Sequence, residues 1–402
     1  MNILILTSVY RDPSLGSKDR STNVVNSFVK EWSIQGHNVV VIHNSHCFPR
    51  FLYKLPKKIN ELLEAKLGFP ILDYEGVKEK NYYDSGAEIF RLPIKKYIPH
   101  TSPSNRAIKK QVNKINEILK KNKFKPDVVT GHWASPQMEI ISKLKSSYNC
   151  KTAIVLHGLG YINSNKFSTS KYIENIDRIG TRSMYQAKVA KDILGLDKMP
   201  FVCNSGVPNV YLNHYNLYLN KYENIKKWKI TFVGRLVRYK NVDSIIKALS
   251  NIEEDWELNI VGDGAQEEEL KKLSKRLKCD EKINFLGRIS RDDVMDVLQD
   301  THIFIMISTN EVFGLVYLEA MAASCLTIAS KDGGVDGIIK NNLNGYLCEQ
   351  GNSHDLNKLL KKIMNSEVEE IKNKAYNAYF TANKYSDYNA AERYLKEITI
   401  RN

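Results

Sequence analysis

The chain has 402 residues, of which 43% are hydrophobic and 26% are charged, a balance typical of globular proteins that excludes the disordered and collagen-like classes. Its length exceeds that of a typical single core, so we expect two domains. The formal net charge of +14 lies in the first half, because residues 1–200 hold 32 Lys and Arg against 17 Asp and Glu, whereas residues 201–402 hold 27 against 28.

No apolar run approaches the roughly 18 residues of a bilayer-spanning helix, and the first strand is too short for the apolar core of a signal peptide. We therefore expect a cytoplasmic protein, or one that lies peripherally on the inner face of the membrane. The six cysteines are scattered without a Cys-x-x-Cys pair or a Cys/His cluster, which predicts neither a disulfide framework nor a zinc site.

Short apolar strands alternate with amphipathic helical patterns through the first half, which is typical of a parallel sheet wrapped by helices. Residues from about 44 to 105 fit this alternation poorly because they are rich in aromatic residues and proline, and we interpret them as an insertion that faces a substrate. The predicted strands are 1–8, 38–43, 127–131 and 151–157, and the predicted helices are 22–35 and about 136–145.

A run of lysines between Lys109 and Lys125 shares helical spacing with apolar residues such as Ile108 and Val112. An amphipathic surface helix with a solvated basic face explains this pattern. The alternative is attraction of that face to anionic lipid headgroups, to which the segment 51–67 would add an apolar edge. No recognisable nucleic-acid module accompanies the charge, so no nucleic-acid partner is expected.

A second series of strands and helices begins near residue 228, and we expect it to form a second doubly wound domain. We place the domains at 1–208 and 209–384, with 385–402 as a terminal helix that packs back on the first domain. The predicted strands are 229–234, 256–262, 282–286, 302–307 and 326–329, and the predicted helices are 241–250, 265–277, 290–299, 314–323 and 367–400.

The stretch from Asn310 to Ala322 is the most informative in the chain because it places Glu311 and Glu319 eight residues apart across the start of a helix. An apolar strand precedes it, and Gly314 allows a close turn before the helix. The free N–H groups of a first helical turn form a seat for a phosphate, and each glutamate can accept hydrogen bonds from hydroxyl groups that flank it. A ligand with hydroxyls on both sides of a phosphate is a nucleotide sugar.

The alternative is that Glu311 complements the helix dipole and that Glu319 is a solvated helix residue. The neighbours of Glu319 are largely apolar, so this carboxylate is expected to be at least partly buried and to have a partner. Both interpretations remain open on these residues alone.

Gly234 ends a predicted strand and is followed by Arg235, with Lys240 five residues further on. A turn with two cations at the carboxyl edge of a strand suits a pyrophosphate, and structural ion pairs are the alternative. Arg288 and Ile289 follow another strand, where backbone groups can read a base edge unless they form a plain loop. The turn that contains Gly262 and Gly264 has Glu267 in place of the third glycine of a dinucleotide fingerprint. A nicotinamide-dependent enzyme is therefore the least favoured class.

In the first domain, His157 closes a strand at the edge where open α/β sheets bind ligands, although a structural histidine is the alternative. Gly16 follows the first strand, where it would let backbone N–H groups approach a phosphate. His132 is a weaker candidate on the acceptor side.

The segment from Glu311 to Glu319 resembles the Glu-x7-Glu motif of the GT-B retaining glycosyltransferases of the family 4 type, which includes sucrose synthase-like and bacterial polysaccharide or lipopolysaccharide enzymes. The order of the other motifs agrees with it: LHG, VCNSGVP, FVGRLVRYKN, VGDG and FLGRIS, and after the glutamates SKDGGVDGII. The resemblance spans nearly the whole chain. It implies an α/β GT-B fold, in which two doubly wound Rossmann-like domains face an interdomain cleft.

The resemblance also implies a role for each matching residue. Arg235 and Lys240 would hold the donor diphosphate in place of a metal ion, so neither a metal nor another cofactor is implied. Glu319 would bind the ribose hydroxyls, and Glu311 would contact hydroxyls of the donor sugar, as would His157. The remaining donor-binding positions would be Gly16, Gly234, Arg288, Ile289 and the backbone amides of Gly314, Leu315 and Val316.

We therefore expect a metal-independent, retaining hexosyltransferase or N-acetylhexosaminyltransferase. It would move a sugar from a nucleoside diphosphate donor, with UDP as the first choice, to a glycan or lipid-linked acceptor in surface polysaccharide assembly. An anionic membrane surface is the expected partner of the N-terminal domain. The alternatives are a GT-B sugar-nucleotide epimerase or hydrolase, and a non-catalytic basic protein that binds lipid or nucleic acid.

Overall fold

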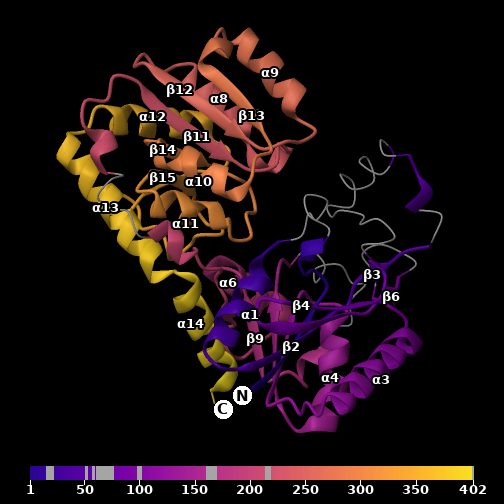
Figure 1. The fold of residues 1–402 in the computed structure, drawn as a ribbon. Coiled ribbons are helices and arrows are strands. Elements are labelled where there is room, and N and C mark those ends of the chain that lie inside the picture. The colour runs from indigo at the N-terminus through magenta and orange to yellow at the C-terminus, as the bar shows by residue number, and fades with distance from the viewer. Residues whose placement is uncertain are drawn as a thin grey trace. The chain divides into compact units, whose positions relative to one another are not determined.

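The chain divides into two compact units, each an α/β structure built on a mainly parallel sheet (Figure 1). Unit 1 comprises Met1–Arg182, Gln186–Cys203 and Ala390–Asn402, and unit 2 comprises Ser183–Tyr185 and Asn204–Asn389. The computed structural model describes residues 1–14, 22–49, 53–56, 59, 77–96, 102–159, 170–212 and 219–400. Gly16 and most of the segment 51–67 lie outside the described residues, so the expectations for them stay predictions.

Unit 1 is built on a sheet with strand order β10-β9-β8-β7-β1-β2-β5-β4, in which only the edge pair β4 and β5 is antiparallel. Its central strands are apolar runs buried on both faces, as a parallel sheet covered by helices requires. The strands are β1 (Asn2–Thr7), β2 (Asn38–His43), β4 (Lys80–Asp84), β5 (Ala87–Arg91), β7 (Val128–His132), β8 (Lys151–Leu156), β9 (Arg178–Thr181) and β10 (Phe201–Val202), and a separate parallel pair is β3 (His46–Cys47) with β6 (Ile94–Lys95).

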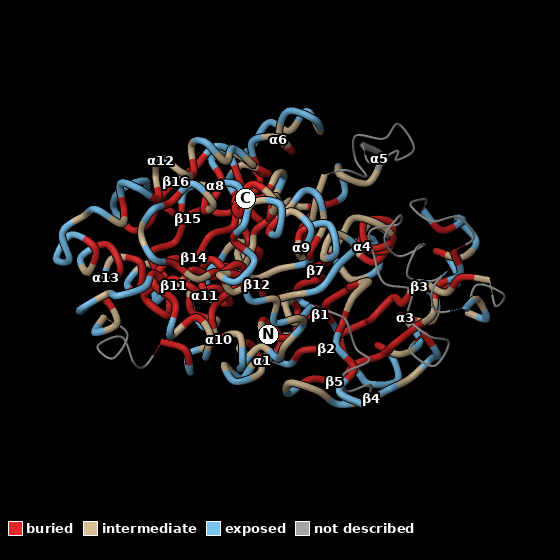
Figure 2. The backbone as a smooth tube through the Cα atoms, turned by 90° about the horizontal axis from the view of Figure 1, so that it is seen from above, coloured by how far each residue is buried: buried red, intermediate tan, exposed pale blue. Residues whose placement is uncertain are grey.

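Helices cover both faces of this sheet because successive side chains of a strand point to opposite sides. Ile3 and Ile5 of β1 belong to one apolar cluster with the first and last helices, whereas Leu4 and Leu6 belong to a second cluster with α3 and α4. Figure 2 shows these central strands as buried backbone. The helices are α1 (Val24–Ile34), α3 (Asn105–Lys121), α4 (Gln137–Tyr148), α5 (Ser170–Ile173), α6 (Met184–Leu194) and, from Ala390 on, α14 (Asp387–Thr399).

The described residues 77–96 correct the interpretation of 44–105 as an insertion. β4 and β5 form a hairpin, and β5 pairs in parallel with β2, so this segment continues the main sheet. The two turn residues, Ser85 and Gly86, both have positive φ angles (53° and 84°), as a tight hairpin connection requires. The Ser-Gly turn is therefore the signal that the sequence interpretation overlooked.

Helix α3 confirms the amphipathic helix predicted from the lysine run. The Ser104 hydroxyl accepts a hydrogen bond from the Ala107 N–H (3.3 Å) and caps the first turn. Ile108, Val112 and Ile115 are buried against the sheet, and the opposite face is basic.

Unit 2 contains a six-stranded, fully parallel sheet with strand order β13-β12-β11-β14-β15-β16. The alternation predicted for the second half is confirmed, and β16 and α12 extend it. The strands are β11 (Trp228–Val233), β12 (Trp256–Val261), β13 (Ile283–Gly287), β14 (Ile303–Met306), β15 (Leu326–Ser330) and β16 (Tyr346–Cys348). The helices are α8 (Val242–Leu249), α9 (Glu267–Arg276), α10 (Arg291–Gln299), α11 (Leu315–Ala322), α12 (Ser353–Met364) and α13 (Val368–Lys384).

The tail predicted as helical from 367 to 400 forms two helices, α13 and α14, with a break at Tyr385 and Ser386. Val207 forms a β-bridge with Ser386 at this break, because the backbone groups there are free of the helical ladder. Within the described ranges, no helix combines the length and the apolar character that a membrane crossing requires.

Candidate functional site

The strand order of unit 2 reverses direction between β11 and β14, which makes the carboxyl ends of these two strands a topological switch point. The loop after β11 contains Gly234, Arg235 and Lys240, and the loop after β14 contains Glu311 and Gly314. The fold therefore places the two strongest sequence motifs on adjacent loops, at the edge where open α/β sheets bind ligands.

An ion pair joins the two loops. The Lys240 ammonium contacts a carboxylate oxygen of Glu311, and each of the two side chains is only 12% exposed. The Tyr239 carbonyl accepts a hydrogen bond from the Thr309 N–H at 2.7 Å, and the Asn241 side-chain amide donates to the Ile307 carbonyl at 2.8 Å. These contacts hold the Lys240 ammonium in place. Lys240 therefore forms a structural ion pair, as the alternative interpretation of this residue proposed.

Arg235 differs from Lys240 because its side chain is exposed, and no hydrogen bond or ion pair to it occurs among the described residues. It stands next to Gly234, directly after the last residue of β11. Its guanidinium donors are therefore available to an anion at the same sheet edge.

Two glycines let the loops of β11 and β12 pack backbone against backbone. A Cβ atom on Gly262 would lie 1.9 Å from the Gly234 carbonyl oxygen, and one on Gly264 would lie 2.4 Å from the Leu236 carbonyl oxygen. Any side chain at either position would push the loop that carries Arg235 away from the sheet edge. The two glycines that resemble the start of a dinucleotide fingerprint thus serve the packing of this loop.

Helix α11 begins directly after Gly314, whose φ of 73° lies in the left-handed region. The N–H groups of Leu315 and Val316 occupy the first helical turn, where intrahelical acceptors are missing, and both residues are half-buried. The Tyr317 hydroxyl donates to the Met306 carbonyl at 2.6 Å and fixes the helix start against β14. This helix start has the N–H geometry that binds a phosphate.

Glu319 is only 8% exposed and has the partner that its apolar surroundings predicted. Arg291, the first residue of α10, donates from Nε to Oε1 of Glu319 at 2.7 Å. Burial lowers the pKa of Arg291, but the charge and hydrogen bond of Glu319 outweigh this effect and raise it. No described residue donates a hydrogen bond to Oε2 of Glu319, which leaves that oxygen for a ligand hydroxyl.

The sequence interpretation missed Arg291 because this residue lies 28 positions before Glu319 and belongs to no recognised motif. The Tyr211 ring lies 5.8 Å from the Arg291 guanidinium, and its hydroxyl donates to Asp292 at 2.9 Å. Arg288 and Ile289 follow β13 at the edge of the same sheet, where Arg288 is exposed and Ile289 is half-buried.

Unit 1 has its own switch point, between β1 and β7. The Gln137 side chain donates to the Ser8 hydroxyl at 2.8 Å and to the His132 carbonyl at 3.0 Å, and so ties the two strand ends together. Asn44, at the end of β2, donates to the same Gln137 side chain at 3.2 Å. This edge is held mainly by neutral amides and hydroxyls, unlike the charged edge of unit 2.

His157 follows β8 at this edge, and the structure gives it a partner that the sequence did not reveal. Its Nε2 lies 2.9 Å from Nδ1 of His132, and its ring stacks on Trp133 with centroids 4.0 Å apart. Burial, followed by the positive charge of Arg182, lowers the pKa of His132 to about 3 and lowers the pKa of His157. Both imidazoles are therefore neutral at pH 7.

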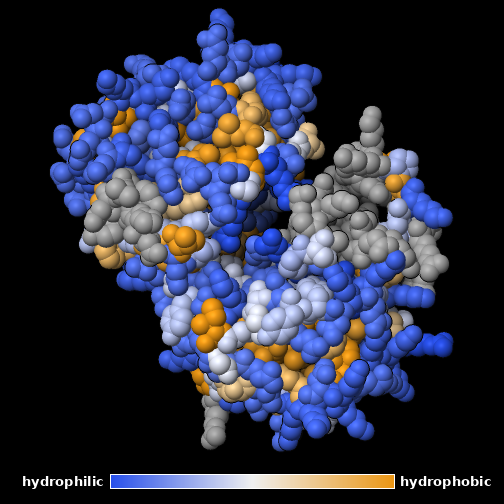
Figure 3. All heavy atoms as spheres, viewed as in Figure 1, coloured by the Kyte–Doolittle hydropathy of each residue, from blue (hydrophilic) through white to orange (hydrophobic). Residues whose placement is uncertain are grey.

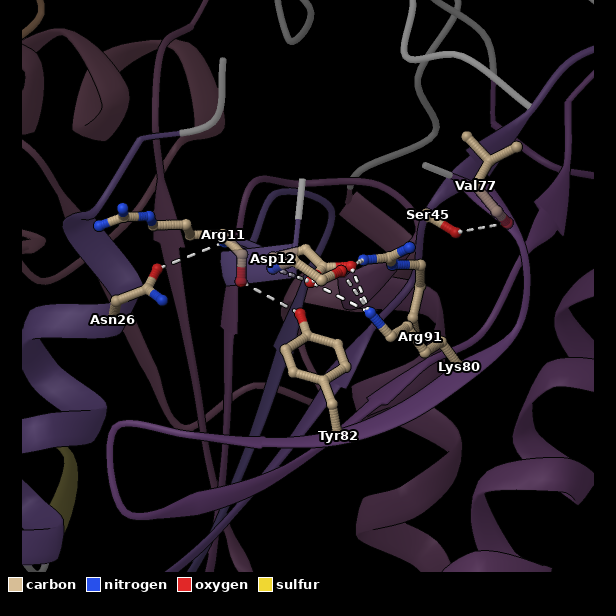
Figure 4. Close-up of polar contacts among 9 residues, drawn as sticks. Arg11, Asp12, Asn26, Ser45, Val77, Lys80, Tyr82 and Arg91 are labelled. Atoms are coloured by element: carbon tan, nitrogen blue, oxygen red, sulfur yellow. Dashed lines mark hydrogen bonds and ion pairs between the residues drawn. The ribbon is translucent and has the colours of Figure 1, made fainter. Parts of the chain in front are cut away.

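The start of the loop after β1 is anchored by Asp12, which is 2% exposed. Figure 4 shows its carboxylate between Arg91, which is itself buried, and Lys80, whose Nζ lies 3.1 Å from Oδ2. Ser14 donates to Oδ1 through both its N–H (2.9 Å) and its hydroxyl (2.7 Å). Burial raises the pKa of Asp12, but these hydrogen bonds outweigh burial and lower it to about 2. Gly16, two residues beyond Ser14, lies outside the described residues.

The surface of unit 1 carries the basic face of α3. The face drawn in Figure 3 is mostly hydrophilic, with smaller hydrophobic patches. Lys114 pairs with Glu79, and this pair lies on the surface. The exposed basic residues in and after α3 are Arg106, Lys109, Lys110, Lys120, Lys121, Lys123 and Lys125.

Comparison with known proteins identifies related sequences and structures of the same fold. Residues 220–380 match the family "Glycosyl transferases group 1". An uncharacterized glycosyltransferase of Haemophilus influenzae is 34% identical over 151 residues (37% of this chain, 42% of that protein), and the N-acetyl-alpha-D-glucosaminyl L-malate synthase of Bacillus anthracis is 35% identical over 123 residues (30% and 32%). The chain therefore matches less than half the length of either relative.

Solved structures cover nearly the whole chain. Anabaena HepE in complex with UDP-glucose superposes with a TM-score of 0.66 at 16% identity, over 98% of each chain. A glycosyltransferase from Rickettsia africae superposes with a TM-score of 0.69 at 18% identity, over 99% of this chain and 97% of that one. At these identities the similarity establishes the fold, which is GT-B.

Proposed function

Because this chain belongs to the GT-B glycosyltransferases with a group 1 domain, we propose that it transfers a sugar from a nucleoside diphosphate sugar, with UDP as the nucleotide, to a glycan or lipid-linked acceptor. The observation that carries this proposal is the cationic switch point of unit 2. There, Lys240 is held by Glu311, while Arg235 is unpaired among the described residues. Solved structures of the same fold include one with UDP-glucose bound.

In this proposal the donor diphosphate lies at the carboxyl ends of β11 and β14. Arg235 binds phosphate oxygens through its guanidinium fork, and Lys240 contributes a second positive charge. Both cations stabilise the negative charge that develops on the leaving diphosphate, which is the role a metal ion has in other transferases. The N–H groups of Leu315 and Val316, after the turn at Gly314, bind the phosphate farther from the nucleoside.

Glu311 has two roles in this arrangement. Its contact with Lys240 orients the ammonium in the free protein, and its carboxylate accepts hydrogen bonds from hydroxyls of the donor sugar. Glu319 accepts a hydrogen bond from a ribose hydroxyl through Oε2, while Arg291 occupies Oε1. Gly234, Arg288 and Ile289 line the donor side of the sheet edge. From unit 1, His157 contacts the transferred sugar, and Gly16 approaches the phosphate.

The proposed reaction is metal-independent and retains the anomeric configuration. The acceptor hydroxyl attacks the anomeric carbon on the face from which the diphosphate leaves, and a leaving phosphate oxygen accepts the proton of that hydroxyl. The bond from the anomeric carbon to the phosphate oxygen breaks, and a bond to the acceptor oxygen forms. The transferred group is a hexose or an N-acetylhexosamine, and the products are a glycoside and a nucleoside diphosphate.

For the acceptor side, we propose a lipid-linked glycan at the cytoplasmic face of a membrane, in surface polysaccharide assembly. The exposed lysines of α3 support this proposal because each basic residue near an anionic bilayer contributes about 1 kcal/mol of attraction. Co-sedimentation with phosphatidylglycerol vesicles at low and at physiological salt tests this part.

The experiment that tests the function is product analysis. The full chain is incubated with UDP-, GDP- and ADP-sugars, with and without a lipid-linked acceptor, and mass spectrometry follows both products. Release of UDP together with a glycosylated acceptor is the expected result. An epimerised nucleotide sugar, or hydrolysis at an equal rate without acceptor, contradicts the proposal in favour of the epimerase or hydrolase alternative.

A further inference from the structure

A chain of hydrogen bonds runs through the core of unit 1 from the last helix to His157. The Thr130 hydroxyl of β7 lies 2.5 Å from the Tyr394 hydroxyl of α14, which lies 3.3 Å from Nε2 of His132. Nδ1 of His132 lies 2.9 Å from Nε2 of His157. Four side chains, from β7, from α14 and from the position after β8, thus form one continuous polar path within unit 1.

The first three members of this path are enclosed. Thr130 and His132 are fully buried, and Tyr394 is 1% exposed. Aromatic rings surround His132, with Phe28 stacked on it and Tyr394 edge-on to it. Burial keeps both imidazoles neutral, so each ring carries one proton. Which group donates and which accepts along the path then depends on the orientation of the two buried hydroxyl protons.

Thr130 decides the direction. Among the described residues, the only hydrogen-bond partner of its hydroxyl is the Tyr394 oxygen. If Tyr394 donated to Thr130, the Thr130 proton would be buried without an acceptor, which is costly. Thr130 therefore donates to Tyr394, and Tyr394 donates to Nε2 of His132. His132 then carries its proton on Nδ1 and donates it to Nε2 of His157.

The path ends at Nδ1 of His157, which must carry the proton of that ring. His157 is partly exposed, and its Nδ1 has no hydrogen-bond partner among the described residues and is not an enclosed atom. Trp133 covers one face of the ring at a centroid distance of 4.0 Å, which restricts the ring to one orientation. The N–H group of His157, just after β8, thus has no acceptor among the described residues.

We propose that His132 and Tyr394 are positioning residues that hold His157 as the Nδ1–H tautomer, so that it donates a hydrogen bond to an oxygen of the transferred sugar. This inference rests on the proposed function for the identity of the ligand, whereas the tautomer stands on the contacts within unit 1 alone. The chemistry recognised is an oxygen lone pair, as on a sugar hydroxyl or an N-acetyl carbonyl. The terminal helix α14 thereby sets the polarity of a residue that precedes it by more than 200 positions.

The direct test is nuclear magnetic resonance of the full chain with ¹⁵N-labelled histidine at pH 7, with the His157 signals assigned by their loss in His157→Gln. The expected wild-type spectrum shows His157 with the proton on Nδ1. In Tyr394→Phe the donor to His132 is missing, so a population of the Nε2–H form of His157 is expected. A wild-type His157 protonated on Nε2 overturns the proposal.

Two further variants sharpen this test. Tyr83→Phe makes the same substitution on an exposed strand residue outside the path and is expected to leave the His157 tautomer unchanged. Thr130→Val removes the first hydroxyl but leaves Tyr394 free to donate to His132, so the Nδ1–H tautomer is expected to persist. A switch of tautomer in Thr130→Val overturns the assigned direction even if Tyr394→Phe fails to fold.

Kinetics separate this inference from the proposed function. Tyr394→Phe is expected to lower kcat/KM for the nucleotide sugar by about tenfold, the effect of one lost hydrogen bond, while the Kd of UDP, which lacks the sugar, stays unchanged. An equal loss in UDP binding overturns the positioning role. If no nucleotide sugar is turned over although the spectra show the Nδ1–H tautomer, the proposed function fails and the tautomer assignment stands.

Discussion

The switch points of the two sheets differ in the charge of the side chains that lie there. In unit 2 the edge is charged, with Lys240 paired to Glu311 and the exposed Arg235 beside it. In unit 1 the edge consists mainly of neutral groups, where His132 and His157 are kept uncharged by burial and by Arg182. A charged edge suits an anion such as a diphosphate, and a neutral edge with fixed donors suits hydroxyl groups, which is the division that the proposed function requires of Arg235 and Lys240 in unit 2 and of His157 in unit 1.

The largest effect on stability is expected at the buried ion pair of Asp12 and Arg91, which is an exception to the mainly neutral edge of unit 1. Asp12→Asn leaves the guanidinium of Arg91 buried without a counter-charge, which is expected to lower the free energy of unfolding by about 3 to 5 kcal/mol. Urea unfolding followed by circular dichroism measures this change.

Glu79→Gln is the matched control, because it breaks an ion pair with Lys114 on the surface of the same unit. Its effect is expected to stay below about 1 kcal/mol. Equal effects of the two substitutions would show that Asp12 is not a buried anchor of the loop after β1.

The charged edge of unit 2 is expected to determine turnover. Lys240→Ala removes one preorganised positive charge and should lower kcat by a factor on the order of 100 to 1000, equivalent to about 3 to 4 kcal/mol, while the fold persists. Steady-state assay with the donor identified by product analysis measures it. Lys247→Ala, which removes an exposed partner of Asp243, should leave kcat unchanged, and full activity of Lys240→Ala would refute the assignment.

The neutral edge of unit 1 should make stability sensitive to acid. Burial and the charge of Arg182 lower the pKa of His132 from its ordinary value of 6.5 to about 3 in the folded chain, so the unfolded state binds more protons between these values. The free energy of unfolding is therefore expected to fall by about 1.4 kcal/mol per pH unit for each such histidine below pH 6.5. Denaturation at pH 7.5, 6.5 and 5.5 measures the slope, and an unchanged slope in His132→Gln would argue against a buried neutral imidazole.

A smaller effect is expected at Glu319. Glu319→Gln keeps the shape of the side chain but weakens its acceptance of a ribose hydroxyl, so binding of UDP should weaken by about 1 to 1.5 kcal/mol. Binding of 2′-deoxy-UDP and 3′-deoxy-UDP, compared with UDP by calorimetry, completes the test. If the wild-type chain binds both deoxy forms with the same affinity as UDP, Glu319 does not bind a ribose hydroxyl.

The sequence predicts unit 2 better than unit 1 because the evidence in unit 2 is local. The strand, turn and helix around Gly314 lie within about twenty residues, so periodicity and one glycine predict them together. In unit 1, the decisive contacts join residues far apart in the chain, such as Tyr394 with His132 and Arg91 with Asp12. No periodicity connects such pairs, and only the folded sheet brings them together.

The same reason explains which site residues were found. Glu319 was predicted to be buried with a partner because its neighbours in the helix are apolar, but the identity of that partner, Arg291, depends on how α10 packs against α11. Positions 77–96 were misinterpreted because the Ser-Gly turn was overlooked and β5 pairs with β2 across more than forty residues. Features that depend on residues close together in the chain can be predicted from the sequence, whereas strand pairing across the sheet cannot.

Binding of the diphosphate by Arg235 and Lys240 is tested by calorimetric titration of the full chain with UDP, made in parallel on wild type and on the double variant Arg235→Ala, Lys240→Ala. We expect saturable binding by wild type, with a thermal stabilisation of about 2.7 kcal/mol at 100 times the Kd, and at least a hundredfold weaker binding by the double variant. Equal affinity of the two proteins for UDP would show that Arg235 and Lys240 do not bind the diphosphate.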